Sequence, residues 1–294
     1  MRPTLAKYLI ESASSNSKLI FLTADLGFGV FDEFKDKFPD RYINVGIAEA
    51  GMITIAAGLA AEGFTPIVYS IASFLLPKTY EQVRLLSAYN ENKIIIVGAG
   101  GGLSYSMSGP SHHSLDDLAL ALLIPNMNVF CPSGPDSLRK VLKMSSESEN
   151  SSYIQIGKFG EPDYPRIKIV ENSKLGLISC GVIANDAFKI HNELVQNNVS
   201  ADLIIIESLR PFNRTELAKF IKGKEMLVII EESWEGLSLY SIVIEYLYQN
   251  KIDLKLIRIG PPHEILKDNV DRNNWLLQFG LSYENLIDLM GSQQ

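Results

Sequence analysis

The residues best suited to chemistry in this chain are a glutamate in an apolar segment and two adjacent histidines in a glycine-rich loop. Glu49 is the only charged residue in the segment 44–59, NVGIAEAGMITIAAGL, and His112 and His113 lie in the loop 98–114. Carboxyl and imidazole groups are the side chains that most often transfer protons in enzymes. A simpler interpretation of Glu49 is a first-turn glutamate that interacts with the positive end of a helix dipole. Both interpretations are open from this segment alone.

The segment 44–59 is predicted to form a helix with one buried apolar face. Its apolar residues recur at helical spacing, and they are Ile47, Met52, Ile55, Ala56 and Leu59. Alanine and other small residues fill most of the remaining positions, so other parts of the molecule can approach closely. Glu49 is therefore expected to lie where another group packs over it.

The loop 98–114, GAGGGLSYSMSGPSHHS, begins with four glycines in five residues. Glycine permits positive backbone dihedrals and lets the backbone approach a ligand closely. The loop lacks the Gly-Lys-Ser/Thr of a P-loop, and Leu103 stands where a dinucleotide fingerprint needs its third glycine. The run 109–114, GPSHHS, instead brings two imidazoles to the carboxyl end of a predicted parallel strand, where open α/β sheets bind ligands. A histidine that merely caps a turn is the alternative.

Strands and helices alternate along the whole chain, which predicts an α/β fold with mostly parallel sheets flanked by helices. In the first half, strands are predicted at 18–23, 42–45, 65–70, 93–97, 129–131 and 153–156. Helices are predicted at 3–13, 31–38, around Glu49 with an end near Gly63, at 79–89 and at 135–144. In the second half, strands are predicted at 175–179, 203–206, 226–231 and 254–259, and helices at 183–196, 214–221, 238–248 and 283–290.

A segment rich in glycine, proline and charge, 157–174, separates the two alternations. Such a composition is typical of a connection between domains. We therefore predict a first domain at 1–160, a linker at 161–174 and a smaller second domain at 175–294.

Composition narrows the possible functions. The 294 residues are 46% apolar and 21% charged, as in ordinary soluble proteins of two domains. A formal net charge of -7 argues against a nucleic-acid partner, and the sequence contains no apolar stretch long enough for a membrane span. No metal-ligand cluster is apparent. Two cysteines in or beside apolar runs and a polar N-terminus without a signal-peptide core predict a cytoplasmic protein.

Three segments taken in order, GIAEAGM at 46–52, ASFLLPKTYEQVR at 72–84 and GPSHHSLDDLALALLIPNMNVFCPS at 109–133, resemble the pyrimidine-binding domain of transketolases. The resemblance continues through the C-terminal domain of that family and so covers nearly the whole chain. The 1-deoxyxylulose-phosphate synthases share the Phe-Pro-Asp-Arg-Tyr seen here at 38–42, but their histidine loop differs more. The β subunits of 2-oxo acid dehydrogenases share the glutamate and lack the histidine pair.

The resemblance implies thiamin diphosphate as cofactor and assigns roles to individual residues. Glu49 would hydrogen-bond the ring nitrogen of the aminopyrimidine and promote its imino tautomer, which activates the cofactor. Phe74 would stack on the pyrimidine, because an aromatic face buries a planar group well, and Tyr80 would line the pocket. His112 would serve the oxygens of the donor sugar as a hydrogen-bond and proton-transfer group. His113 replaces the usual glutamine, and its role toward the substrate is open.

Other positions bear on the substrate. Asp25 matches an aspartate near the substrate channel in the family, although an ordinary turn aspartate is an equal alternative. Lys158 stands where the family has an arginine that grips phosphate, and lysine would hold a phosphate without the bidentate fork. Gly100 and Ser108 occupy the places of a usual histidine and aspartate. These departures leave open a sugar that is modified or unphosphorylated.

The sequence contains no Gly-Asp-Gly, the stretch through which this family binds Mg²⁺ and the diphosphate. The resemblance therefore implies a separate N-terminal subunit that holds both, in a heterotetramer of two chains of each kind. The assembled enzyme would transfer a two-carbon ketol unit from a ketose to an aldose. Alternatives are a subunit of a 1-deoxyxylulose-phosphate-synthase-like or 2-oxo-acid-decarboxylating enzyme, or a non-catalytic assembly or regulatory subunit.

Overall fold

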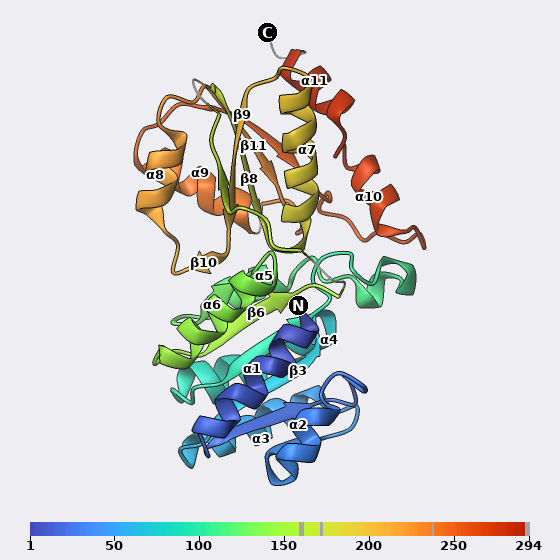
Figure 1. The fold of residues 1–294 in the computed structure, drawn as a ribbon, viewed down its shortest axis with the longest axis vertical. Coiled ribbons are helices and arrows are strands. Elements are labelled where there is room, and N and C mark those ends of the chain that lie inside the picture. The colour runs from blue at the N-terminus through green and yellow to red at the C-terminus, as the bar shows by residue number, and fades with distance from the viewer. Residues whose placement is uncertain (159–161, 171–172, 237, 292–294) are drawn as a thin grey trace.

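The chain forms two α/β domains, each built on its own sheet (Figure 1). The computed structural model describes residues 1–158, 162–170, 173–236 and 238–291. Both sheets are mostly parallel and are flanked by helices on both faces, as predicted from the alternation of strands and helices. The first domain lies below the second in Figure 1, with β6 nearer to the second domain than β3.

The first sheet has seven strands in the order β10-β5-β6-β4-β3-β1-β2. All of its pairings are parallel except that between β10 and β5. The strands are β1 Leu19–Thr23, β2 Tyr42–Asn44, β3 Thr65–Ile71, β4 Ile95–Ala99, β5 Asn128–Phe130, β6 Ser152–Ile156 and β10 Ser208–Arg210. β10 comes from the second half of the chain, so the two domains share a sheet edge.

The second sheet has five strands in the order β12-β11-β8-β9-β7, and β7 is antiparallel to β9. The strands are β7 Ile167–Lys168, β8 Leu175–Cys180, β9 Ala201–Ile206, β11 Met226–Ile230 and β12 Lys255–Ile259. β7 falls within the predicted linker 161–174, of which residues 161, 171 and 172 lie outside the described part of the chain. The domain boundaries themselves stay a prediction.

Helices cover both faces of each sheet because successive strand residues are apolar on both sides. In β1, Leu19 and Phe21 pack in the cluster under α1, α2 and α6, whereas Ile20 and Leu22 pack in the cluster under α3 and α4. The helices are α1 Arg2–Ser15, α2 Asp32–Lys37, α3 Glu49–Ala61, α4 Ala72–Gln82, α5 Asp117–Leu123, α6 Pro135–Glu147, α7 Ala184–Gln196, α8 Arg214–Ile221, α9 Leu239–Gln249, α10 Arg272–Gln278 and α11 Tyr283–Gly291. A strand buried on both faces is the pattern of parallel sheets.

Several elements differ from the prediction. The helix predicted at 79–89 begins earlier, as α4 at Ala72, and continues as a π-helix over Val83–Tyr89. Pro77 lies inside α4, where it costs the helix a backbone hydrogen bond. The short helices α5 and α10 and the short strands β7 and β10 were not predicted. Each spans at most seven residues, too few to produce a clear periodicity.

Candidate active site

The predicted site residues follow five parallel strands of the first sheet at their carboxyl ends. Asp25 follows β1, Glu49 follows β2, Phe74 follows β3, His112 follows β4 and Lys158 follows β6. These strands run in the spatial order β6-β4-β3-β1-β2, so the five segments emerge along one edge of the sheet. This edge is where ligands bind in open α/β sheets.

Glu49 is the first residue of α3 and is almost fully buried, with 2% of its surface exposed. Its Oε2 atom accepts a hydrogen bond from Nζ of Lys78 at 2.7 Å, and the Lys78 side chain is 52% exposed. The Lys78 ammonium compensates the charge of the buried Glu49 carboxylate, although the Lys78 side chain is itself accessible to solvent. The sequence analysis missed Lys78, because the helix predicted at 79–89 begins after it. In the structure α4 carries Lys78 four residues after Phe74, on the same side of the helix.

The helix α4 connects Glu49 with the histidine loop, because it packs against both α3 and the short 3₁₀ turn Pro110–His112. The ring of Phe74 meets that of His112 edge to face, with 4.8 Å between their centroids. Tyr105 lies next, 6.2 Å from the His112 centroid, and Nζ of Lys158 lies 4.2 Å from the Tyr105 centroid. A continuous row of contacts therefore runs from Phe74 to Lys158, and Tyr105 is a member that sequence analysis missed.

The two histidines have different environments. His112 is half-buried, and its Nδ1 lies 3.0 Å from the hydroxyl of Ser111. His113 is buried, and its Nε2 lies 3.1 Å from the carbonyl oxygen of Ser106 within the same loop. This contact gives His113 a part in holding the loop together. Its predicted contact with substrate stays a prediction.

Two further predicted residues lie outside this row of contacts. Asp25 is exposed, with a positive φ of 51°, and its amide donates to Oδ1 of Asn44 at 3.0 Å. Tyr80 packs partly buried against the core, and the guanidinium of Arg84 lies 5.8 Å from its ring centroid. These contacts are compatible with a turn residue and a core aromatic, and the roles implied by the resemblance stay predictions.

The glycines of the loop 98–114 are surrounded by side chains of the chain itself. A Cβ atom at Gly100 would collide with the ring of Tyr105, and one at Gly101 with Gln155. At Gly102, whose φ is +62°, it would lie 2.6 Å from Cδ of Glu232. The space on the Cβ side of these three glycines is therefore filled by the chain itself, and a close approach of the loop backbone to a ligand stays a prediction. The glycines allow side chains to pack close beneath the loop.

A buried polar cluster lies beneath the glycine loop. The carboxylate of Asp117 accepts hydrogen bonds from the hydroxyl of Tyr153 at 2.5 Å and from the amide of Gln155 at 2.8 and 2.9 Å. Burial raises the pKa of Asp117 to about 6, although both hydrogen bonds oppose the change. Burial and the carboxylate of Asp117 raise the pKa of Tyr153. This cluster joins α5 to β6, the neighbour in the sheet of β4, from which the glycine loop departs.

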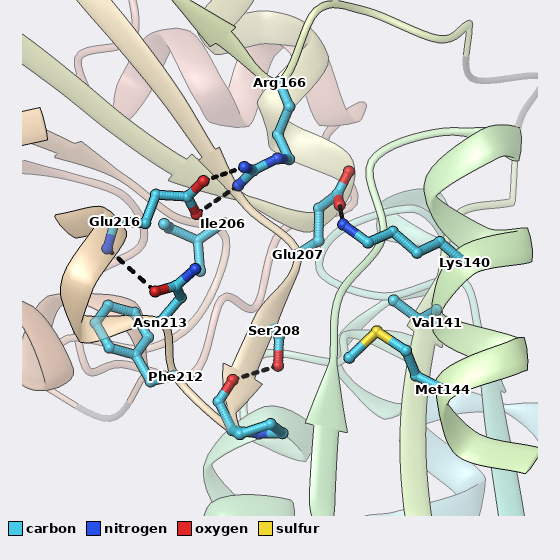
Figure 2. Close-up of a pocket in the computed structure, with 11 residues that line it drawn as sticks. Lys140, Val141, Met144, Arg166, Ile206, Glu207, Ser208, Phe212, Asn213 and Glu216 are labelled. Atoms are coloured by element: carbon cyan, nitrogen blue, oxygen red, sulfur yellow. Dashed lines mark hydrogen bonds and ion pairs between the residues drawn. The ribbon is translucent and has the colours of Figure 1, made fainter. Parts of the chain in front are cut away.

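In the described part of the chain, three cavities lie near the domain junction, and two of them are larger than the third, which has a volume of about 150 Å³. One of about 390 Å³ opens between the glycine loop and the start of α10, and Tyr105, Lys158 and Arg272 are among its lining residues. The other, of about 380 Å³, lies between α6 and the segment from β9 to α8 (Figure 2). Its charged side chains are paired, Lys140 with Glu207 at 3.9 Å and Arg166 with Glu216 in a bidentate contact. The first cavity adjoins the predicted site residues.

The comparison with protein families matches the chain in two consecutive parts. Residues 1–158 match "Transketolase, pyrimidine binding domain", and residues 166–284 match "Transketolase, C-terminal domain". The chain belongs to the transketolase family. This family uses thiamin diphosphate. Within the described residues, no helix has the length and apolar character of a membrane span.

Relatives of this transketolase-family chain include subunits of split enzymes. One subunit of the apulose-4-phosphate transketolase of Phocaeicola vulgatus is 26% identical over 283 residues, which cover 90% of this chain and 91% of that protein. A putative transketolase C-terminal section from Methanocaldococcus jannaschii is 27% identical over 299 residues, with coverage of 97% and 93%. A solved structure described as "Split gene transketolase, inactive beta4 tetramer" matches with a TM-score of 0.85, 26% identity and coverage of 97% and 95%.

The residues at the sheet edge fit the pyrimidine part of the cofactor. Glu49 offers a buried carboxylate and Phe74 a half-buried aromatic face, the two kinds of group that a planar aminopyrimidine requires. Among the residues that the structure describes, no group of three or more His, Cys, Asp or Glu side chains could hold a metal ion. The fit therefore concerns the pyrimidine, and the expectation of Mg²⁺ stays a prediction about a partner chain.

Proposed function

We propose that this chain is the C-terminal subunit of a split, thiamin diphosphate-dependent transketolase that transfers a two-carbon ketol unit from a ketose to an aldose. The observation that carries the proposal is that the one helix α4 contacts both the buried Glu49, through Lys78, and His112, through Phe74. The similarity to a subunit of a transketolase, over most of both chains, supports it.

Glu49, Phe74 and His112 each have a part in the proposed reaction. Glu49 would hold a proton at the pyrimidine nitrogen, in exchange for its contact with the solvent-accessible ammonium of Lys78. Phe74 would hold the pyrimidine ring by stacking. When bound, thiamin diphosphate supplies the nucleophilic carbon that carries the two-carbon unit. His112 would donate hydrogen bonds to the oxygens of the donor sugar and move protons there.

The surroundings of Glu49 support a partner subunit. The prediction that Ile47 and Ile55 help form a buried face is wrong, because they are 80% and 43% exposed. α3 begins at Glu49, after Ile47, and its buried face is formed by Met52, Ile53, Ala56 and Ala57. Exposed apolar side chains beside a buried carboxylate suit a surface that another chain covers. We infer that the N-terminal subunit covers this surface and holds Mg²⁺ and the diphosphate, in a heterotetramer with two chains of each kind.

The substrate is a sugar whose distal end approaches Lys158. The cavity between the glycine loop and α10 is lined by serine hydroxyls, Tyr105 and this lysine. Such groups bind either a phosphate or the hydroxyls of an unphosphorylated sugar. The relative from Phocaeicola vulgatus takes its name from a sugar phosphate, apulose 4-phosphate. A sugar phosphate is therefore the first donor class to test, with unphosphorylated and modified sugars beside it.

Calorimetric titration with thiamin diphosphate and Mg²⁺ tests the proposal. We expect tight binding only by the mixture of this chain with its N-terminal subunit, followed by ketol transfer on a panel of ketoses and aldoses. The related structure of an inactive beta4 tetramer supports the expectation that this chain is inactive by itself. Tight binding of the cofactor by this chain alone would contradict the split site.

The 1-deoxyxylulose-phosphate synthases are a second candidate class. The enzyme of Methylacidiphilum infernorum is 26% identical over 307 residues, which cover 96% of this chain and 46% of that protein. Pyruvate consumption with release of carbon dioxide by the assembled complex would identify this class. Cofactor binding without either reaction would favour a non-catalytic assembly or regulatory role.

A further inference from the structure

The loop that carries His112 is closed at its base by a short antiparallel bridge. The amide of Gly102 donates to the carbonyl of Ser114 at 3.0 Å, and the amide of Ser114 donates to the carbonyl of Gly102 at 2.9 Å. The position of His112 therefore depends on what holds this base, because the loop between the two residues leaves the sheet and returns to it.

The second domain holds both sides of that base. The amide of Leu103 donates to Oε1 of Glu232 at 2.9 Å, and the carbonyl of Leu115 accepts from the amide of Trp234 at 2.9 Å. Leu103 and Leu115 also pack with two apolar side chains of the second domain in one cluster, Leu266 and Trp275. Glu232 and Trp234, which follow β11, thus clamp both ends of the segment that carries His112, at Leu103 and at Leu115.

Glu232 is itself held by Arg272, which Asp186 holds in turn. The guanidinium of Arg272 donates from Nε to Oε1 at 2.9 Å and from Nη2 to Oε2 at 2.8 Å, and its Nη1 donates to Asp186 at 2.8 Å. The side chains of Glu232, Arg272 and Asp186 are 5%, 15% and 14% exposed, respectively. A bidentate pair of this kind fixes orientation as well as distance. Gly102 completes the fit, since a side chain there would collide with Glu232.

We propose that Glu232, held by Arg272, is a positioning residue that sets the place of His112 for the donor sugar, so that the second domain contributes to the reaction by clamping the histidine loop. The inference rests on the proposed function for the role of His112. The clamp itself rests on the hydrogen bonds and packing described above.

The adjacent residue provides a matched control. Glu231 is 0% exposed and pairs with Nε of Arg258 at 2.8 Å, and it also accepts from the amide of Tyr240. Both glutamates follow β11 and form a buried pair with an arginine, but it is Glu232 that accepts the hydrogen bond donated by the loop amide of Leu103. Each Glu→Gln change puts an amide NH2 against the paired arginine, so both variants should weaken folding. In Glu232→Gln the remaining oxygen is no longer oriented by the bidentate pair with Arg272, so this variant alone should loosen the loop.

The experiment compares the two variants in the complex with the N-terminal subunit. For Glu232→Gln we expect faster amide hydrogen exchange at 101–115 and a kcat/KM for the donor sugar that is about tenfold lower, with unchanged affinity for thiamin diphosphate. For Glu231→Gln we expect wild-type exchange in the loop and wild-type kcat/KM per folded enzyme. Equal effects of the two variants on loop exchange, or a released loop with unchanged donor kcat/KM, would overturn the proposal.

A milder variant keeps the test decisive if Glu232→Gln does not fold. Arg272→Lys retains the positive charge but loses the bidentate fork, so exchange at 101–115 should be faster than in wild type. Loop exchange identical to wild type in Arg272→Lys would contradict the clamp. If the wild-type complex shows no ketol transfer, the proposed function fails, whereas the exchange comparison still decides whether the clamp exists.

Discussion

The two domains each place a buried glutamate at the carboxyl edge of a parallel sheet, and the partners of these glutamates differ. Glu49 in the first domain pairs with Lys78, whose side chain is half exposed. Glu231 in the second pairs with Arg258, which is 9% exposed, and also accepts a backbone hydrogen bond. A carboxylate with an accessible partner can exchange that partner for a ligand, whereas one with buried partners stabilises its surroundings. Burial of a charge is therefore no guide to chemistry unless the partner is considered too.

The largest effect expected from this comparison concerns Glu49. Glu49→Gln keeps the size of the side chain but removes the group that shares a proton with the pyrimidine. We expect ketol transfer by the assembled complex to fall by roughly 10²–10⁴-fold. Glu62→Gln, an exposed glutamate at the end of the same helix, is the control and should retain full activity. Full activity of Glu49→Gln would remove the distinction drawn between Glu49 and Glu231.

The corresponding change in the second domain should affect stability instead. Burial raises the pKa of Glu231, and the Arg258 guanidinium opposes that change. Arg258→Met leaves this carboxylate buried without its charge partner, which should lower the free energy of unfolding by about 3–5 kcal/mol.

Chemical denaturation of the subunit measures this loss. Lys174→Met breaks the exposed pair with Glu225, of 3.1 Å, and should change stability by less than about 1 kcal/mol. Similar losses in Arg258→Met and Lys174→Met would mean that burial does not increase what the pair of Glu231 and Arg258 contributes to the free energy of unfolding.

The histidines extend the comparison within the first domain. His112 is half-buried beside Phe74, whereas the ring of His113 contacts a carbonyl inside its own loop. His112→Gln should lower kcat/KM for the donor sugar by about 10²-fold and leave thermal stability nearly unchanged. His113→Gln should show the opposite balance, with a lower melting temperature and a smaller kinetic loss. Steady-state kinetics and thermal unfolding of both variants distinguish these outcomes.

How much of the site could be predicted depends on the range of the interactions. The alternation of strands and helices places the segments after β1 to β4 and after β6 at one sheet edge, and this followed from local patterns. Lys78 was missed because it lies before the helix predicted at 79–89, and a lone lysine there also suits solvent. The bond from Leu103 to Glu232 spans 129 positions in the sequence, and no local pattern indicates it. β10 was missed for the same reason, because three residues join a sheet from the other half of the chain.

Asp117 offers the smallest and most specific test, since it is a buried carboxylate of the first domain whose partners are both buried. Burial raises its pKa from 3.8 to about 6. The folded chain therefore holds this proton at higher pH than the unfolded chain, and the stabilisation, fully present below about pH 4, is lost as the pH rises to about 6. Asp117→Asn removes this titration, so stability relative to wild type should rise by on the order of 2 kcal/mol between pH 4 and pH 7.

Urea unfolding of the subunit at several pH values measures that difference. Asp36→Asn, which changes an exposed carboxylate, should follow the wild-type pH profile. Parallel profiles for wild type and Asp117→Asn would mean that the carboxylate titrates alike in the folded and unfolded chains. Asp117 would then resemble an exposed carboxylate despite its burial. A difference of the expected sign would instead group Asp117 with Glu231, as a carboxylate whose pKa is raised by burial among buried partners, in contrast to Glu49, whose accessible partner suits it to chemistry.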